Sequence, residues 1–191
     1  MICPSNQFCI GNVPHPKYTY LHDVYSPDVI CVMLSILALI IGYILVTFLI
    51  TYRVRNKVFN PVWMSENWDE EWKAAGLGEK ASQAGYPDMG SGPFSKKLSY
   101  SQWIYFNNAQ RCQGNFLEQI NFMLVSVVFT ALWSPWAAFA LMMTFCVSRL
   151  LFSMGYLSWG PKGRLVGAIL GDLAHLTGIV FIQIVVGNLY A

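Results

Sequence analysis

Three long stretches of this chain contain no Asp, Glu, Lys or Arg, and they limit the folds that the chain can adopt. They run from Val29 to Tyr52, from Gln119 to Ser148 and from Leu173 to Ala191. A helix that crosses the hydrocarbon core of a bilayer needs roughly 20 predominantly apolar residues. The composition agrees, because only 12% of the 191 residues are charged, against ~25% in soluble domains. The sequence therefore predicts an integral membrane protein.

The number of spans follows from how these stretches divide. The stretch 119–148 is too long for one span, and Trp133-Ser134-Pro135-Trp136 divides it. Proline suits the first turn of a helix and tryptophan the headgroup level, so we expect a tight hairpin there. The expected fold is an all-α four-helix membrane bundle over residues 29–191, with spans at about 29–52, 100–133, 135–157 and 164–189.

The fourth expected span begins with glycines at intervals of four residues, Gly163, Gly167 and Gly171. Small residues at this spacing let helix backbones approach closely in lipid. Chance glycines in an apolar helix are the alternative. We expect the glycine side of this helix to lie against a neighbouring helix.

The basic residues predict the orientation, because Lys and Arg near span ends stay cytoplasmic. Only Lys17 lies on the opposite side from the other basic residues in the four-span arrangement. Residues 1–28 are then a lumenal tail and residues 53–99 a cytosolic loop. The residues on the cytosolic side are Arg53, Arg55, Lys57, Lys73, Lys80, Lys96, Lys97, Arg111, Arg149, Lys162 and Arg164.

The cytosolic loop contains an amphipathic pattern. Met64, Trp68 and Trp72 recur every four residues, with acidic residues and Lys73 around the rest of the turn. This spacing predicts a short helix that ends near Gly76 and lies on the membrane surface or against the bundle.

The second span carries polar residues at membrane depth, where such residues are costly and point to function. Arg111, Asn115 and Glu118 have helical spacing and share one face near the cytosolic end, and Asn108 extends that face by one turn. Tyr156 and Arg164 are expected at the same level. These residues suit a small anion, because arginine binds carboxylates bidentately. A structural Arg–Glu pair between helices would explain the same spacing.

A second set of polar residues lies deeper. Arg149 and Asp172 fall at matched depth in the hairpin of the third and fourth spans, so we expect an intramembrane ion pair between them, mainly structural. His175 follows Asp172 by one turn, and we expect it to be a packing residue rather than a ligand or a proton relay.

The cysteines and the net charge indicate no further site. No metal-ligand spacing is present, and a net charge of +2 gives no reason to expect nucleic acid. Cys3 and Cys9 could pair in an oxidising compartment, whereas Cys31 and Cys146 are expected to be buried apolar residues.

Two segments resemble the signature of one family of membrane proteins. The segment 106–118 (FNNAQRCQGNFLE) resembles the run that opens the second helix in the membrane-associated proteins in eicosanoid and glutathione metabolism, the MAPEG family. The segment 149–156 (RLLFSMGY), followed by Pro161, Arg164 and Gly167, resembles the second conserved block of that family. Within that family the chain resembles the third type of microsomal glutathione transferase, although the first loop is longer here than in many members.

The resemblance implies a homotrimer of four-helix bundles that binds glutathione between subunits near the cytosolic face. It implies that Arg164 holds the glutathione thiol as the thiolate, and that Gln113 lies at the subunit contact or reaches glutathione from the adjacent protomer. The residues implied to bind the peptide are Arg111, Asn115, Glu118 and Tyr156. Phe152 stands where some members have a tyrosine. Gln119 stands where the leukotriene-conjugating synthase has a second glutamate, which counts against leukotriene synthesis.

The expected function is a glutathione transferase or peroxidase, because an arginine beside the sulfur favours the nucleophilic thiolate. The second substrate is expected to be lipophilic and to arrive from the bilayer lipids. The alternative is a non-catalytic scaffold or an accessory subunit of a larger membrane complex, which the long Trp-rich loop favours. A transporter is not expected, because the charged residues gather at one end of the bundle. The membrane is expected to be that of the endoplasmic reticulum, with mitochondria as the alternative.

Overall fold

A computed structural model of the chain describes residues 9–10, 13–14 and 27–190. The first of these residues form a short antiparallel pair of strands, β1 (Cys9–Ile10) and β2 (Val13–Pro14). The other residues before residue 27 lie outside the described residues, and so does any Cys3–Cys9 bond, whereas residues 27 and 28 of the expected lumenal tail begin the first long helix. Everything that positions the candidate site is within residues 27–190.

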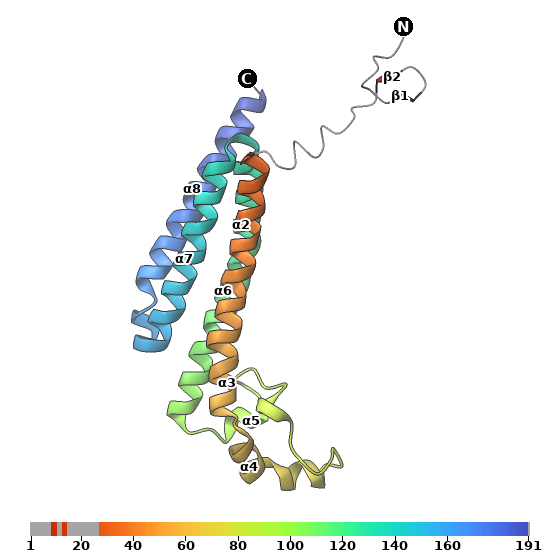
Figure 1. The fold of residues 1–191 in the computed structure, drawn as a ribbon. Coiled ribbons are helices and arrows are strands. Elements are labelled where there is room, and N and C mark those ends of the chain that lie inside the picture. The colour runs from red at the N-terminus through yellow and green to blue at the C-terminus, as the bar shows by residue number, and fades with distance from the viewer. Residues whose placement is uncertain (1–8, 11–12, 15–26, 191) are drawn as a thin grey trace.

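Four helical segments of the described chain are long and apolar enough to cross a membrane, which confirms the predicted fold (Figure 1). The first consists of α2 (Pro27–Ile44), the π-helical segment η1 (Leu45–Tyr52) and α3 (Arg53–Val58). The others are α6 (Tyr100–Trp133), α7 (Pro135–Trp159) continued by η3 (Gly160–Lys162), and α8 (Leu165–Tyr190). The first helix continues past the expected end at residue 52.

The tight hairpin between α6 and α7 forms where the sequence predicts it. Ser134 separates the two helices, and its hydroxyl accepts a hydrogen bond from the backbone N–H of Ala137, while Pro135 occupies the first turn of α7. At the other end of α6, Ser99 and Gln102 form a capping box. The long first loop and the α7–α8 connection lie together at one end of the bundle (Figure 1).

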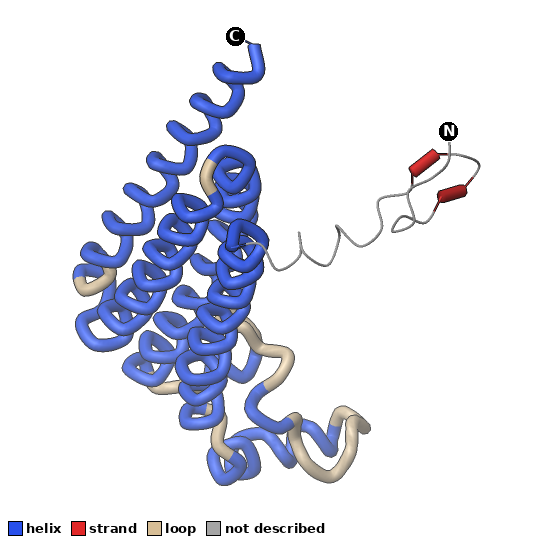
Figure 2. Tube along the Cα trace, turned by 45° about the horizontal axis from the view of Figure 1, so that its top comes forward, coloured by secondary structure: helices blue, strands red, loops and turns tan. Residues whose placement is uncertain are grey.

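The helix α7 is the most buried of the four, because it packs against α2, α6 and α8. Figure 2 shows the bundle from a second direction, with the first loop projecting beyond it. Phe116, Met142 and Phe145 are fully buried at the centre. The outer faces of α2, α6 and α8 carry exposed Leu, Ile, Val and Phe side chains, as expected of helices that face lipid.

Gly163, just before α8, and Gly167, within it, make the close approach to α7 that the sequence predicts. A Cβ at Gly163 would collide with the carbonyl oxygen of Gly155, and a Cβ at Gly167 would collide with the backbone nitrogen of Phe152. The backbones of α7 and α8 therefore touch directly, which only glycine permits at these positions.

The first loop folds into a packed unit. It contains α4 (Pro61–Ala74), the short helical turn η2 (Gln83–Gly85) and α5 (Pro93–Lys96). The predicted amphipathic helix is α4, which is capped by Asn60 and buries Met64. Trp68 and Trp72 of α4 pack against the Phe94 ring, with centroids 4.9 and 6.1 Å away.

Arg55 explains why the first helix continues into the loop. Its side chain is 2% exposed, and it donates hydrogen bonds to the carbonyl oxygens of Ala84 (3.2 Å) and Asp88 (2.6 Å). The guanidinium also lies over the Tyr86 ring, 4.2 Å from the centroid. The last turn of the first span thus ties the loop to the bundle.

Asp88 stabilises the same part of the first loop through hydrogen bonds to its backbone. Its carboxylate is buried and accepts hydrogen bonds from the backbone N–H groups of Gly90 (2.7 Å), Gly92 (2.9 Å) and Ser95 (2.6 Å). Burial alone would raise the pKa of Asp88, but these N–H donors outweigh it and hold the pKa below its ordinary value. The ionised carboxylate therefore stabilises the loop.

Replacing Asp88 with Ala should lower the free energy of local unfolding of residues 84–97 by about 3 kcal/mol, because hydrogen bonds to a charged group contribute about 1.5–3 kcal/mol each. Hydrogen exchange of these amides measures the loss. In the wild type, the contribution of Asp88 is present above the ordinary carboxyl pKa and is lost as the pH falls through the lowered pKa of the folded state. Glu79→Ala, which removes an exposed ion pair with Lys73, is the control and should change exchange little. Unchanged protection in the Asp88 variant would contradict this role.

Candidate functional site

A polar cavity of about 190 Å³ opens between the first loop, α6, α7 and the start of α8. We call it the polar pocket. It brings together the five residues that the sequence predicts at one level: Arg111, Asn115, Glu118, Tyr156 and Arg164. Its other lining residues are Met89, Asn107, Gln110, Gly114 and Phe152.

The charged groups of the polar pocket are not neutralised by one another. Among the described residues, the ion pairs are Lys73–Glu79 and Lys97–Glu71, so Arg111 and Glu118 do not form the structural Arg–Glu pair. Arg164 lies with its guanidinium carbon 5.6 Å from the centroid of the Tyr156 ring. The pocket thus offers two guanidinium groups and one carboxylate to a ligand.

The side chain of Asn115 is held in place by Arg149. Arg149 is 1% exposed, and its Nη1 donates to the Asn115 Oδ1 at 2.5 Å. It also donates to the Gly167 carbonyl and to the Ser148 hydroxyl, both at 3.2 Å. Because arginine can only donate, the amide oxygen of Asn115 must face Arg149. The amide nitrogen of Asn115 is then the end left to donate into the polar pocket.

Among the described residues, Arg149 forms no direct ion pair with Asp172, and the expected pairing stays a prediction. The sequence places Arg149 correctly against α8, where a Cβ at Gly171 would collide with the Arg149 Nη2. The guanidinium lies between α6 and α8 and donates to Asn115 and to the Gly167 carbonyl. Asp172 is exposed.

Asp172 and His175 lie along a second cavity, of about 410 Å³, between α6 and α8. The His175 Nδ1 is 2.8 Å from the carbonyl oxygen of Gly171, and the ring packs edge-on against Phe145 at 5.6 Å. Both are packing contacts, as the sequence predicts, but the His175 Nε2 is buried with no hydrogen-bond partner among the described residues. Glu118 lines this cavity as well as the polar pocket.

Gln113 lies away from the polar pocket. Its Nε2 donates to the hydroxyl of Tyr43 on α2 at 3.4 Å. This matches its position on a different face of α6. A role of Gln113 toward glutathione stays a prediction.

The polar pocket includes residues beyond those expected from the sequence. The helical pattern predicts Asn108 on the pocket face, but Asn107 lines the pocket instead. Asn107, Gln110 and Gly114 are spaced at three and four residues from one another and from Arg111 and Glu118, so helical periodicity could have found them. Met89 comes from the loop, where no periodic pattern points to it.

The chain was compared with known proteins. The model of the MAPEG family matches residues 29–184. No curated protein and no solved structure matches the chain. The matched region contains most of the first and fourth spans, all of the second and third, and every residue of the polar pocket, and the chain therefore belongs to the MAPEG family.

Proposed function

We propose that this protein is a glutathione-dependent membrane enzyme, a transferase or peroxidase, and that glutathione binds in the polar pocket. The observation that carries the proposal is the meeting of Arg111, Asn115, Glu118, Tyr156 and Arg164 in one cavity. Arg111 and the Asn115 amide suit the carboxylates of the tripeptide, and Glu118 suits its ammonium group. Tyr156 contacts the peptide.

Arg164 is the proposed catalytic residue. A cation beside the sulfur favours the thiolate, which is the nucleophile. In conjugation, the thiolate forms a C–S bond with an electrophilic carbon, and the electron pair of the bond that breaks leaves with the displaced group or moves into the acceptor. In reduction of a lipid hydroperoxide, the thiolate attacks the outer oxygen, the O–O bond breaks, and the lipid alkoxide leaves and takes up the proton that the thiol released, giving the alcohol. A second glutathione then converts the resulting sulfenic acid to the disulfide and water.

A homotrimer would complete the glutathione site. The cavity of about 190 Å³ in one chain is smaller than the roughly 300–1,000 Å³ typical of small-molecule sites. Arg111 and Glu118 are both exposed on α6, at a depth where unpaired charge is costly. A neighbouring subunit would cover them, and the family generally forms trimers. The proposed site faces the cytosol, in the endoplasmic reticulum or alternatively in mitochondria.

Equilibrium binding of glutathione to the protein in lipid nanodiscs tests this proposal. We expect Arg111→Ala to weaken binding at least tenfold, because a lost charge-assisted hydrogen bond costs about 1.5–3 kcal/mol. Lys162→Ala is the control, since Lys162 is an exposed cation near the same end that does not line the pocket. No binding to the wild type would favour the non-catalytic scaffold or accessory subunit.

A further inference from the structure

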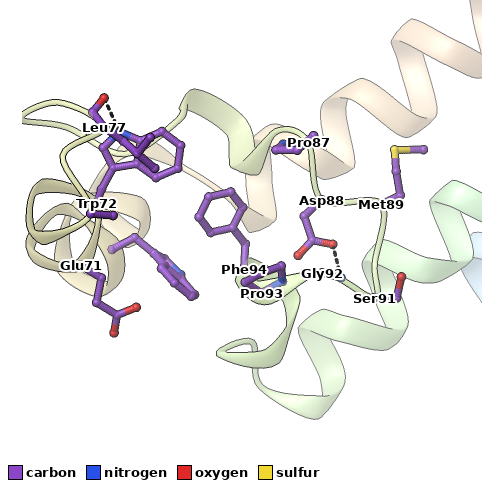
Figure 3. A pocket seen from close by; sticks show the side chains of 12 residues that line it. Glu71, Trp72, Leu77, Pro87, Asp88, Met89, Ser91, Gly92, Pro93 and Phe94 are labelled. Carbon is purple, nitrogen blue, oxygen red and sulfur yellow. Dashed lines mark hydrogen bonds between the residues drawn. The ribbon is translucent and has the colours of Figure 1, made fainter.

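A third and larger cavity lies within the first loop, between α4 and residues 87–94 (Figure 3). We call it the loop pocket. Its volume is about 640 Å³, within the roughly 300–1,000 Å³ of small-molecule sites. Trp68, Trp72 and Phe94 supply aromatic walls, and Leu77 and Met89 supply aliphatic ones. The Phe94 ring projects toward Trp72, with the two rings stacked at 29°.

The two acidic residues of the loop pocket are already neutralised. Glu71 forms an ion pair with Lys97 at 2.6 Å. The Asp88 carboxylate is saturated by its three backbone N–H donors. The lining therefore presents no unpaired charge, and it suits an uncharged apolar ligand rather than an ion.

The walls of the loop pocket are fixed by contacts outside it. Arg55 holds the backbone at Asp88, and Trp103 of α6 donates from its Nε1 to the Gly90 carbonyl at 2.8 Å. Trp72 donates to the Leu77 carbonyl at 3.0 Å, which closes the end of α4. A ligand would enter a preformed cavity, so its binding would lose little free energy to ordering the loop.

Met89 forms part of both pockets. It lines the loop pocket on one side and the polar pocket on the other. The Arg55 Nη2 lies 3.4 Å from its Sδ. Methionine is unbranched and has three rotatable bonds, so it adapts to neighbouring ligands more easily than a branched side chain. Met89 is 60% exposed, so one adaptable side chain at the surface adjoins both the apolar cavity and the proposed glutathione site.

We infer that the loop pocket binds the uncharged lipophilic co-substrate, on the far side of Met89 from the glutathione sulfur. The lipophile is then bound by the cytosolic loop and not solely between the membrane helices. Its role as co-substrate rests on the proposed function, whereas occupancy of the pocket by a lipophile does not.

Photolabelling tests occupancy without catalysis. A diazirine-bearing hexadecanol is added to the protein in nanodiscs, and the labelled peptides are mapped by mass spectrometry. We expect adducts within residues 68–94 of the wild type. In Ala75→Phe, the labelling of these residues, normalised to the labelling of the spans, should fall at least fivefold. Ala75 lines the pocket and is exposed, so a larger side chain there fills the cavity without disturbing a core. Ala74→Phe, at an exposed neighbour outside the lining, should label like the wild type. Labelling confined to the spans, or equal labelling in both variants, overturns the inference.

Kinetics test the co-substrate role with 2-hexadecenal. The glutathione thiolate would form a C–S bond with the β-carbon, and the π electrons would move to the carbonyl oxygen as an enolate, which takes up the proton that the thiol released. We expect Ala75→Phe to raise KM for the aldehyde at least fivefold with kcat and the Kd of glutathione unchanged. An unchanged KM alongside lost labelling would overturn the co-substrate role. Absence of glutathione binding in the wild type would instead overturn the proposed function, while labelling still reports on the pocket.

Discussion

Arg164→Ala should abolish the thiolate absorbance of bound glutathione at neutral pH while glutathione still binds. Arg164 supplies the cation at the open side of the polar pocket, where it lies over Tyr156 and forms no ion pair within the described chain. Lowering a thiol pKa by two units needs about 2.7 kcal/mol, which one partly desolvated arginine can provide. The thiolate fraction at pH 7 should fall at least tenfold, and ultraviolet difference spectroscopy measures it.

Two variants make this result specific to the charge at position 164. Arg164→Lys keeps the charge and should retain part of the absorbance. Lys162→Ala removes a nearby cation outside the polar pocket and should leave the absorbance unchanged. Equal thiolate in the wild type and in Arg164→Ala would reject Arg164 as the activating group.

Gly171→Ala should weaken glutathione binding at least tenfold although Gly171 does not line the polar pocket. The added Cβ would occupy the position of the Arg149 Nη2, so the guanidinium must move and release the Asn115 amide oxygen. Asn115 would then no longer present its amide nitrogen in a fixed direction. Displacing buried hydrogen-bond partners costs about 1–3 kcal/mol each, so the melting temperature should fall as well.

The matched control for this prediction is on the same helix. Gly187→Ala adds the same methyl group to α8 where no atom of the described residues lies within 4 Å, and it should neither weaken binding nor lower the melting temperature. Arg149→Met should reproduce the binding defect of Gly171→Ala. Normal binding in both Gly171→Ala and Arg149→Met would show that Asn115 does not depend on Arg149.

The sequence predicts the bundle well because lipid restricts the chain to few solutions. Helices are needed wherever the backbone meets hydrocarbon, so uncharged runs and the Trp133–Trp136 break locate α6 and α7. Helical spacing then brings Arg111, Asn115 and Glu118 to one face without knowledge of tertiary contacts. Matching depth similarly places Arg149 beside α8.

What the sequence does not provide is the direction of a long side chain and the path of an irregular loop. Arg149 has both Asp172 and Asn115 as candidate partners by depth, and the side-chain torsions select Asn115. Met89 reaches the polar pocket because Arg55 and Asp88 fix the loop backbone. The contacts of Arg149 with Asn115 and of Arg55 with the Asp88 carbonyl join residues more than 30 positions apart, and no local pattern encodes them.

The π-helical turns of η1 have a geometric consequence for the cytosolic end of the first span. A π-helix holds more residues per turn than an α-helix, because its hydrogen bonds reach to the fifth residue. Each residue added this way rotates everything that follows by roughly 100° about the axis. Arg55 lies three residues beyond η1. The winding of this membrane helix therefore sets the direction in which the Arg55 side chain points, which is toward the Asp88 carbonyl. The helical winding inside the membrane thereby determines the direction of the side chain that holds the cytosolic loop.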